Sequence, residues 1–215
     1  MGECPRCGNI HAAGYCPIYG SNEQMHLTPT YAEAMRSLAA ETRLTRGDGN
    51  MCLFHALVGE EDGTGAIAES NGQAAGLRMR AGELMANGYA RSLSNESESL
   101  WNAHVKSMTR TRLRWLPRGA CQATVSACAA AMHRNIVRAD VFPDGGPGTR
   151  GTTVFALFPQ DDDVMIELTV EEARQAIADG AAFVVWASGH YERAVVNEPA
   201  ERPLSAGPRR AAQPK

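Results

Sequence analysis

The 215-residue sequence has no apolar run close to the ~20 residues that a membrane-spanning helix requires. Its first residues, MGECPRCGNIH, also lack the apolar stretch at the centre of a secretory signal peptide. These two absences argue against a helical membrane protein and against a secreted precursor. We therefore expect a cytoplasmic or nuclear protein without a membrane partner.

Neither sign of charge dominates the sequence. The 21 Lys and Arg residues face 24 Asp and Glu residues, which gives a net charge of −3. This balance argues against nonspecific binding of nucleic acid over the whole surface, and it is compatible with a local basic site. Apolar residues make up 44% and charged residues 21%, values typical of folded globular proteins that exclude wholesale disorder. The length favours one domain, alone or with a small module.

The six cysteines are unevenly placed, and three of them lie in the first sixteen residues. Cys4, Cys7, His11 and Cys16 form a C-x2-C-x3-H-x4-C pattern, which supplies the Cys3His set of a tetrahedral structural zinc site. Residues 1–20 are thus predicted to form a zinc-knuckle-like module that binds single-stranded nucleic acid or protein. Two alternatives stay open: His26 as the fourth ligand, and a metal-free segment with three reduced thiols.

The remaining pattern predicts a domain over 28–196 and a disordered tail over 197–215, which is rich in Pro, Ala and Arg. Helices dominate its first half and strands its second half, so we expect an α+β fold with a small central sheet flanked by helices. Thr169 with Glu172 predicts a capping box at the start of a helix. The expected helices cover 29–44, 52–58, 74–87, 100–108, 121–132 and 170–178, and the expected strands cover 135–142, 152–158, 164–168, 183–187 and 192–196.

A cysteine at the start of a short apolar helix is the sharpest chemical signal. Cys52 directly follows the loop GDGNM and opens the segment CLFHAL. The N-terminus of a helix presents unpaired N–H groups and the positive end of its dipole, and both lower the pKa of a thiol. These N–H groups could also stabilise a developing oxyanion, with Gly49 and Asn50 in the loop on that side.

A cysteine nucleophile needs a base, and the base needs an orienting group. The chain supplies His190 in the segment GHYE, between two expected strands. Glu192 follows two residues later, so the period-2 alternation of a strand places it on the same face as His190. Cys52 or His190 alone would be an ordinary packing or surface residue; the combination with the loop and the carboxylate favours a catalytic centre.

These two segments resemble motifs of one enzyme family. DGNMCLFHAL resembles the nucleophile motif Asp-Gly-Asn-Cys-Leu-Phe of the ovarian tumour (OTU) family of cysteine proteases, and GHYERAV resembles its late motif of His, an aromatic residue and an acid or amide. The likeness extends over about 44–196 and is looser in the middle of that range. It implies a papain-like fold with Cys52 as nucleophile and His190 as general base. Asp48 would match the family's loop acid, and Glu192 would stand where the family often has Asp or Asn.

Met51 is one residue more than the family has between the loop acid and the nucleophile. Because this insertion can redirect Asp48, we favour Glu192 as the orienting group and Asp48 as a loop residue on the oxyanion side. The resemblance implies a deubiquitinase that hydrolyses the isopeptide bond after the C-terminus of ubiquitin or a ubiquitin-like protein, with no cofactor in catalysis. The alternative is a catalytically degenerate OTU-fold module that the zinc knuckle tethers to RNA or protein.

Overall fold

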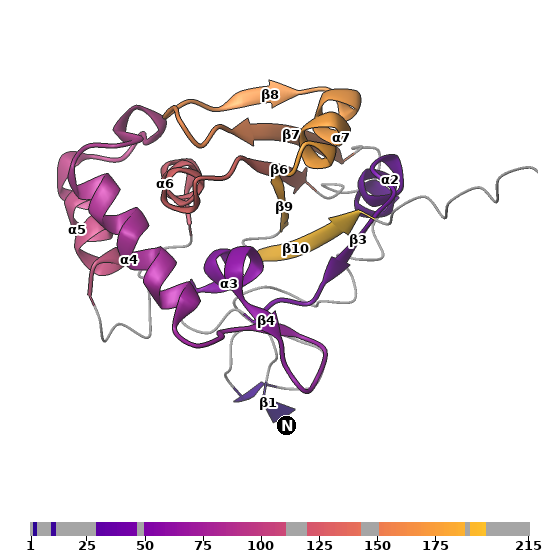
Figure 1. The fold of residues 1–215 in the computed structure, drawn as a ribbon, viewed down its shortest axis with the longest axis horizontal. Coiled ribbons are helices and arrows are strands. Elements are labelled where there is room, and N and C mark those ends of the chain that lie inside the picture. The colour runs from indigo at the N-terminus through magenta and orange to yellow at the C-terminus, as the bar shows by residue number, and fades with distance from the viewer. Residues whose placement is uncertain are drawn as a thin grey trace, which may run out of the picture.

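A six-stranded mixed sheet lies at the centre of the computed structural model (Figure 1). The structure describes residues 2–3, 10–11, 29–46, 50–110, 120–142, 151–187 and 190–196. All neighbouring strands of the sheet are antiparallel except β6 and β9, which are parallel. In spatial order the strands are β3 (Ala40–Arg43), β10 (His190–Val196), β9 (Ala182–Ala187), β6 (Ile136–Phe142), β7 (Thr152–Phe158) and β8 (Ile166–Leu168).

Helices cover both faces of this sheet, as expected for the predicted arrangement of a central sheet flanked by helices. Two small hairpin pairs accompany them: β1 (Gly2–Glu3) with β2 (Ile10–His11), and β4 (Glu60–Glu61) with β5 (Ile67–Ala68). None of the helices in the described part of the chain is long and apolar enough to cross a membrane. The helices are α2 (Pro29–Ser37), α3 (Cys52–Val58), α4 (Gln73–Ala86), the 3-10 helix η2 (Arg91–Leu93), α5 (Glu98–Met108), α6 (Gln122–Met132) and α7 (Val170–Ala178).

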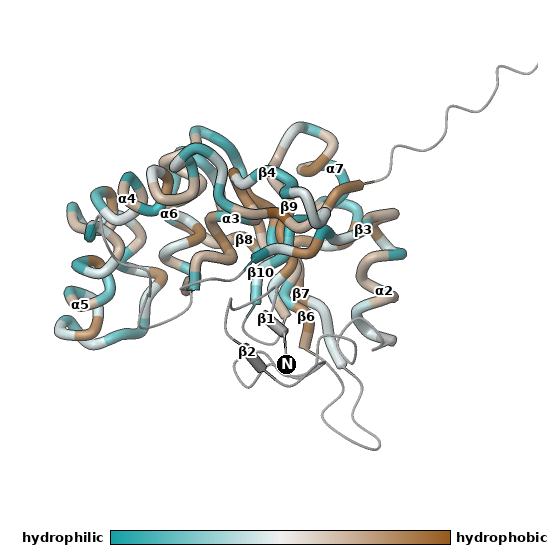
Figure 2. Tube along the Cα trace, turned by 90° about the horizontal axis from the view of Figure 1, so that it is seen from below, coloured by the Kyte–Doolittle hydropathy of each residue, from teal (hydrophilic) through white to brown (hydrophobic). Residues whose placement is uncertain are grey.

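Alternation along the strands divides the apolar residues between two cores. On β9, Ala182 and Val184 join the core under α3, α4, α5 and α6, whereas Phe183 and Val185 join the core under α2 and α7. A sheet buried on both faces needs such continuously apolar strands. Figure 2 shows hydrophobic colours on the central strands and more hydrophilic colours on the outer helices.

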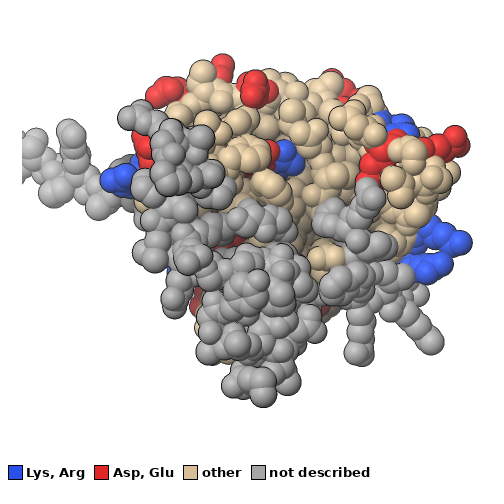
Figure 3. All heavy atoms as spheres, turned by 180° about the vertical axis from the view of Figure 1, so that it is seen from behind, with Lys and Arg blue, Asp and Glu red and all other residues tan. Residues whose placement is uncertain are grey.

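In the view of Figure 3, neither acidic nor basic side chains dominate the described surface. Acidic and basic side chains form small separate groups, mostly near the margins, with uncharged side chains between them. This distribution agrees with the nearly balanced composition, −3 over the whole chain.

Most expected elements are present, and the capping box at Thr169 and Glu172 is confirmed. Two expectations over 28–72 were wrong. The first helix ends at Ser37 rather than at residue 44, because residues 40–43 pair with β10 as an edge strand. The segment 60–72, expected as a loop, contains the β4–β5 hairpin.

Candidate active site

Cys52 opens α3 after a sharp backbone turn. Asn50 has a positive φ of 62°, a left-handed conformation that asparagine tolerates better than most residues. Met51 is the N-cap of α3 and uses no side-chain cap. Cys52 is only 4% exposed. The loop and the helix thus place the thiol at the start of a buried helix, as the sequence predicted.

Arg193 on β10 holds the other end of α3. Its guanidinium donates hydrogen bonds to the carbonyl oxygens of His55 (3.3 Å), Ala56 (2.7 Å) and Gly59 (2.7 Å). Burial, and then the neighbouring charge of Arg134, lower the pKa of Arg193. A cation at the C-terminus of a helix satisfies carbonyls that lack partners within the helix and complements its dipole. The strand that begins with His190 therefore also fixes the helix that begins with Cys52.

His190 is the first residue of β10 and is 1% exposed. Its Nε2 atom donates a hydrogen bond to the carbonyl oxygen of Thr45, 3.0 Å away. A carbonyl oxygen only accepts hydrogen bonds, so Nε2 carries the proton of the neutral ring and Nδ1 is the basic nitrogen. The Thr45 carbonyl thus selects the Nε2-protonated tautomer of the neutral ring, and we expect Glu192 to act on the imidazolium form through its charge.

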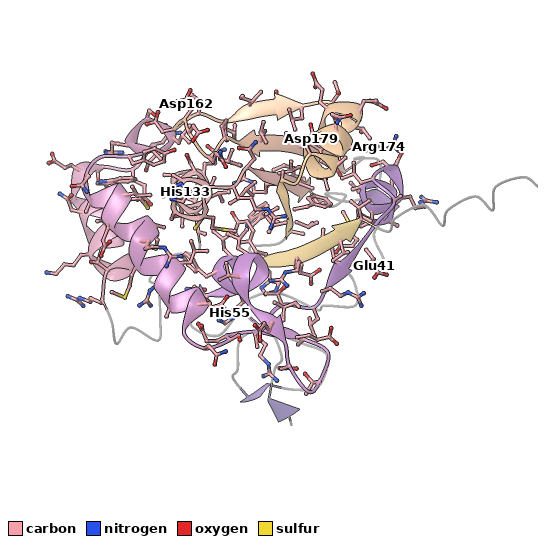
Figure 4. The ribbon with its side chains drawn as sticks, viewed as in Figure 1. Glu41, His55, His133, Asp162, Arg174 and Asp179 are labelled. Atoms are coloured by element: carbon pink, nitrogen blue, oxygen red, sulfur yellow. The ribbon has the colours of Figure 1, made fainter. Side chains whose placement is uncertain are left out.

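The dipeptide Thr45–Arg46 connects this histidine to α3. His55, one turn after Cys52, donates from Nδ1 to the carbonyl oxygen of Arg46 at 2.7 Å. Figure 4 shows His55 on α3, close to the β4 segment. Arg46 in turn donates from Nε to Asp62, 2.7 Å away, in the loop between β4 and β5. Two adjacent backbone carbonyls therefore hold the His190 ring and the Cys52 helix in one network.

Glu192 lies on the α2 face of β10 and is 2% exposed. Tyr31 of α2 donates its hydroxyl to Glu192 Oε2 at 3.0 Å, and Thr42 Oγ1 lies 2.6 Å from the same hydroxyl. Because side chains alternate along a strand, His190 and Glu192 lie on the same face of β10, as the sequence predicted. That Glu192 orients His190 stays a prediction.

Several predicted site residues fall outside the described part of the chain. These are Asp48 and Gly49 of the nucleophile loop and the expected zinc ligands Cys4, Cys7 and Cys16. The fourth expected ligand, His11, is described only as a backbone position in β2, opposite Gly2. Within the described ranges, no group of three or more His, Cys, Asp or Glu residues could hold a metal ion.

A cluster of a thiol, a hydroxyl and an imidazole, which the sequence analysis missed, lies at the start of α6. Cys121 is the N-cap of α6, its Sγ atom lies 3.5 Å from Thr124 Oγ1, and His104 Nε2 lies 3.0 Å from the same hydroxyl. Burial acts to raise the pKa of the Cys121 thiol, but hydrogen bonds from His104 and Thr124 outweigh it and lower that pKa to about 7. The spacing of Cys121 and Thr124, which is that of an N-cap and its N3 residue, was the available signal.

The two carboxyl groups proposed for His190 can be separated by mutation. We expect Glu192→Gln to lower kcat/KM by about 10–10³-fold and Asp48→Asn to lower it less, because β10 fixes Glu192 whereas Met51 lengthens the loop of Asp48. The assay is hydrolysis of a ubiquitin C-terminal amide, with circular dichroism to check folding. Tyr31→Phe, which removes one donor to Glu192, should have a smaller effect in the same direction. A larger loss in Asp48→Asn than in Glu192→Gln would assign the orienting role to the loop acid.

Solved structures that this chain resembles include OTU domains. An OTU deubiquitinase from Wolbachia pipientis wMel, bound to ubiquitin, has a TM-score of 0.46 and 11% identity, over 73% of this chain and 96% of that one. The OTU domain of OTUD1 has a TM-score of 0.45 and 14% identity, over 76% of this chain and 90% of that one. The viral OTU domain protease from Taggert virus has a TM-score of 0.43 and 10% identity, over 72% of this chain and 78% of that one. No protein-family model and no curated protein matches the sequence.

Proposed function

We propose that the chain is an OTU-like cysteine protease in which Cys52 is the nucleophile and His190 is the general base. The observation that carries this proposal is the pair of carbonyls at Thr45 and Arg46, which hold the His190 ring and the α3 helix together. A catalytic cysteine and histidine must keep their relative position through every step of the reaction. A network of short hydrogen bonds among buried groups supplies that rigidity.

The proposed reaction is acyl transfer from a carbonyl carbon to the Cys52 sulfur and then to water. The thiolate of Cys52 attacks the carbonyl, and the leaving amine takes a proton from the imidazolium of His190. His190 then removes a proton from water, whose oxygen attacks the thioester and releases the carboxylate and the thiol. Backbone N–H groups at the start of α3 are the donors available to the oxyanion.

For the substrate, we propose an isopeptide or peptide bond after the C-terminus of ubiquitin or a ubiquitin-like protein. The support for this choice is the resemblance of DGNMCLFHAL and GHYERAV to the two end motifs of the OTU family. The buried state of both Cys52 and His190 is consistent with a narrow approach to the thiol, which suits a thin C-terminal tail.

A ubiquitin derivative with an electrophile at its C-terminus tests the proposal directly. We expect one covalent adduct per chain by intact mass, with the modified peptide containing Cys52. Ubiquitin with an ordinary C-terminal carboxylate is the matched control and should give no adduct. Binding of ubiquitin without an adduct would instead favour the noncatalytic module.

We further propose one structural zinc ion per chain, bound by Cys4, Cys7, His11 and Cys16, because this spacing fits a Cys3His site. Elemental analysis should find one zinc in the full chain and none in a chain that starts at Ser21. The shortened chain should still fold, since the sheet and both cores use residues from 30 onward. Equal zinc in both chains, or none in either, would contradict the assignment.

A further inference from the structure

A cavity of about 420 Å³ lies beside Cys121, on the face of the sheet that α6 covers. Residues from η2 and the loop after it, from the start of α6 and from three strands line this cavity. The residues that matter here are Cys121, Arg138 and Asp140 of β6, and Tyr191 of β10. The volume lies in the range of cavities that admit small molecules.

The thiol of Cys121 is held by polar groups on two helices. The Thr124 hydroxyl contacts both the Cys121 sulfur and His104 Nε2. A thiol with a pKa near 7 is ionised to a larger fraction at neutral pH than an ordinary thiol, and only the thiolate reacts. Cys128, two turns further along α6, is the natural comparison: it is fully buried among apolar residues, and burial raises the pKa of its thiol.

Arg138 supplies a second, independent feature of the same cavity. The residue is 5% exposed, its guanidinium donates to Asp140 Oδ2 at 2.6 Å, and its Cζ atom lies 5.0 Å from the centroid of the Phe158 ring. Its Nε atom and the Oδ1 atom of Asp140 are buried without a hydrogen-bond partner in the described part of the chain. A buried donor without a partner is destabilising, and a small polar ligand in the cavity would offset that cost.

We propose that Cys121 is a second reactive thiol of this protein, a modification site that takes small hydroperoxides through the cavity shared with Arg138. Arg138, which lines the cavity, provides a hydrogen-bond donor for a peroxide oxygen, and Thr124 holds the thiol. Neither Cys52 nor His190 lines this cavity, and the reactivity of Cys121 does not depend on the function proposed for the Cys52 centre.

The reaction is a two-electron oxidation of sulfur by hydrogen peroxide. The Cys121 thiolate attacks one peroxide oxygen, an S–O bond forms, and the O–O bond breaks. The other oxygen leaves as hydroxide and takes a proton to become water, so peroxide is reduced while the thiolate becomes a sulfenic acid. Cys128 cannot resolve this product as a disulfide, because seven helical residues separate the two Cα atoms by about 10 Å, beyond the ~7 Å limit for a bridge.

The charged and titratable groups around the thiol determine how its reactivity depends on pH. Those that line the cavity or bond within the cluster are His104 of α5, Arg138 and Asp140 of β6, Tyr191 of β10, and Glu96 before α5; the neighbouring elements η2 and α4 add Arg91 and Arg80. At pH 6 a thiol with a pKa of about 7 is roughly thirtyfold more ionised than one of about 8.5. The lower nucleophilicity of the more acidic thiolate offsets part of this difference in ionisation. The thiol with a pKa of about 7 should therefore react about fivefold faster at pH 6 than the ordinary thiol.

The experiment treats the full-length protein with hydrogen peroxide, traps sulfenic acid with dimedone and maps the modified peptides by mass spectrometry. We expect Cys121 to be modified at least tenfold faster than Cys128. Alkylation by iodoacetamide at pH 6 should likewise favour Cys121, and Cys121→Ser should abolish both signals at that peptide. Repeating the reaction in Cys52→Ala removes any contribution from the other centre.

Thr124→Val and Arg138→Lys test whether the cluster is responsible. Thr124→Val keeps the side-chain volume but removes the hydroxyl, and we expect it to slow both reactions about fivefold. Arg138→Lys keeps the charge but removes the Nε–H group, and we expect it to slow the peroxide reaction more than the alkylation. Equal modification of Cys121 and Cys128 in the unmutated protein would overturn the proposal, as would a Cys121 rate that neither variant changes.

Discussion

Replacing Cys52 by alanine should abolish the adduct with a ubiquitin electrophile and reduce hydrolysis of a ubiquitin amide by at least 10³-fold. Removal of the nucleophile leaves only binding and oxyanion stabilisation, and in a serine protease the corresponding loss in kcat is about 10⁶-fold. The substitution should leave the fold intact, because alanine is small, favours helices and occupies a helix start whose far end Arg193 holds.

Two other cysteines of the described chain provide matched controls for this experiment. Cys121→Ala and Cys128→Ala should keep the adduct, since Cys121 lines a cavity that Cys52 does not line and Cys128 is enclosed in the core. The measurement is intact mass after a fixed time, with peptide mapping to identify the modified residue. An adduct that persists in Cys52→Ala and disappears in Cys121→Ala would reassign the nucleophile to the second thiol.

Local sequence signals predicted most of the elements that carry the proposed site. Residues 52–58 form the expected short helix, and the limits of α7 and β7 agree with the expected ranges. These segments were predictable because each has its own start and stop signals, such as Gly59 after α3 or the capping box of α7. The placement of His190 and Glu192 on the same face of one strand was also predictable from the period-2 alternation of side chains alone.

Contacts between distant segments could not be read from local patterns. The partner of His190 Nε2 is the backbone carbonyl of Thr45, and a carbonyl has no sequence signature. Residues 40–43 continue an apparent helical pattern, but the edge of β10 offers them strand hydrogen bonds instead. Cys121 and His104 meet only because α5 and α6 pack together, so their shared hydroxyl at Thr124 appears only in the folded chain.

The short segment Thr45–Arg46 connects β10 to α3, a contact that local sequence patterns could not predict. Thr45 follows β3, bonds His190 through its carbonyl, and accepts the backbone N–H of Arg193 on its hydroxyl at 3.2 Å. Arg46 continues the same segment to α3 and to the β4–β5 hairpin. A helix start and a strand start that are 138 residues apart thus share one support, and the position of His190 depends on the whole domain rather than on its own motif.

Replacing His190 by glutamine should lower kcat/KM for the ubiquitin amide by about 10³-fold or more. Glutamine can still donate a hydrogen bond to the Thr45 carbonyl, but it cannot take up or deliver a proton. His55→Gln is the matched control, because His55 is also buried and also donates to a carbonyl of the same dipeptide. We expect His55→Gln to stay within tenfold of the unmutated protein, with circular dichroism as the check on folding. Equal losses in the two variants would mean that both histidines only hold the network together, and that His190 is not the base.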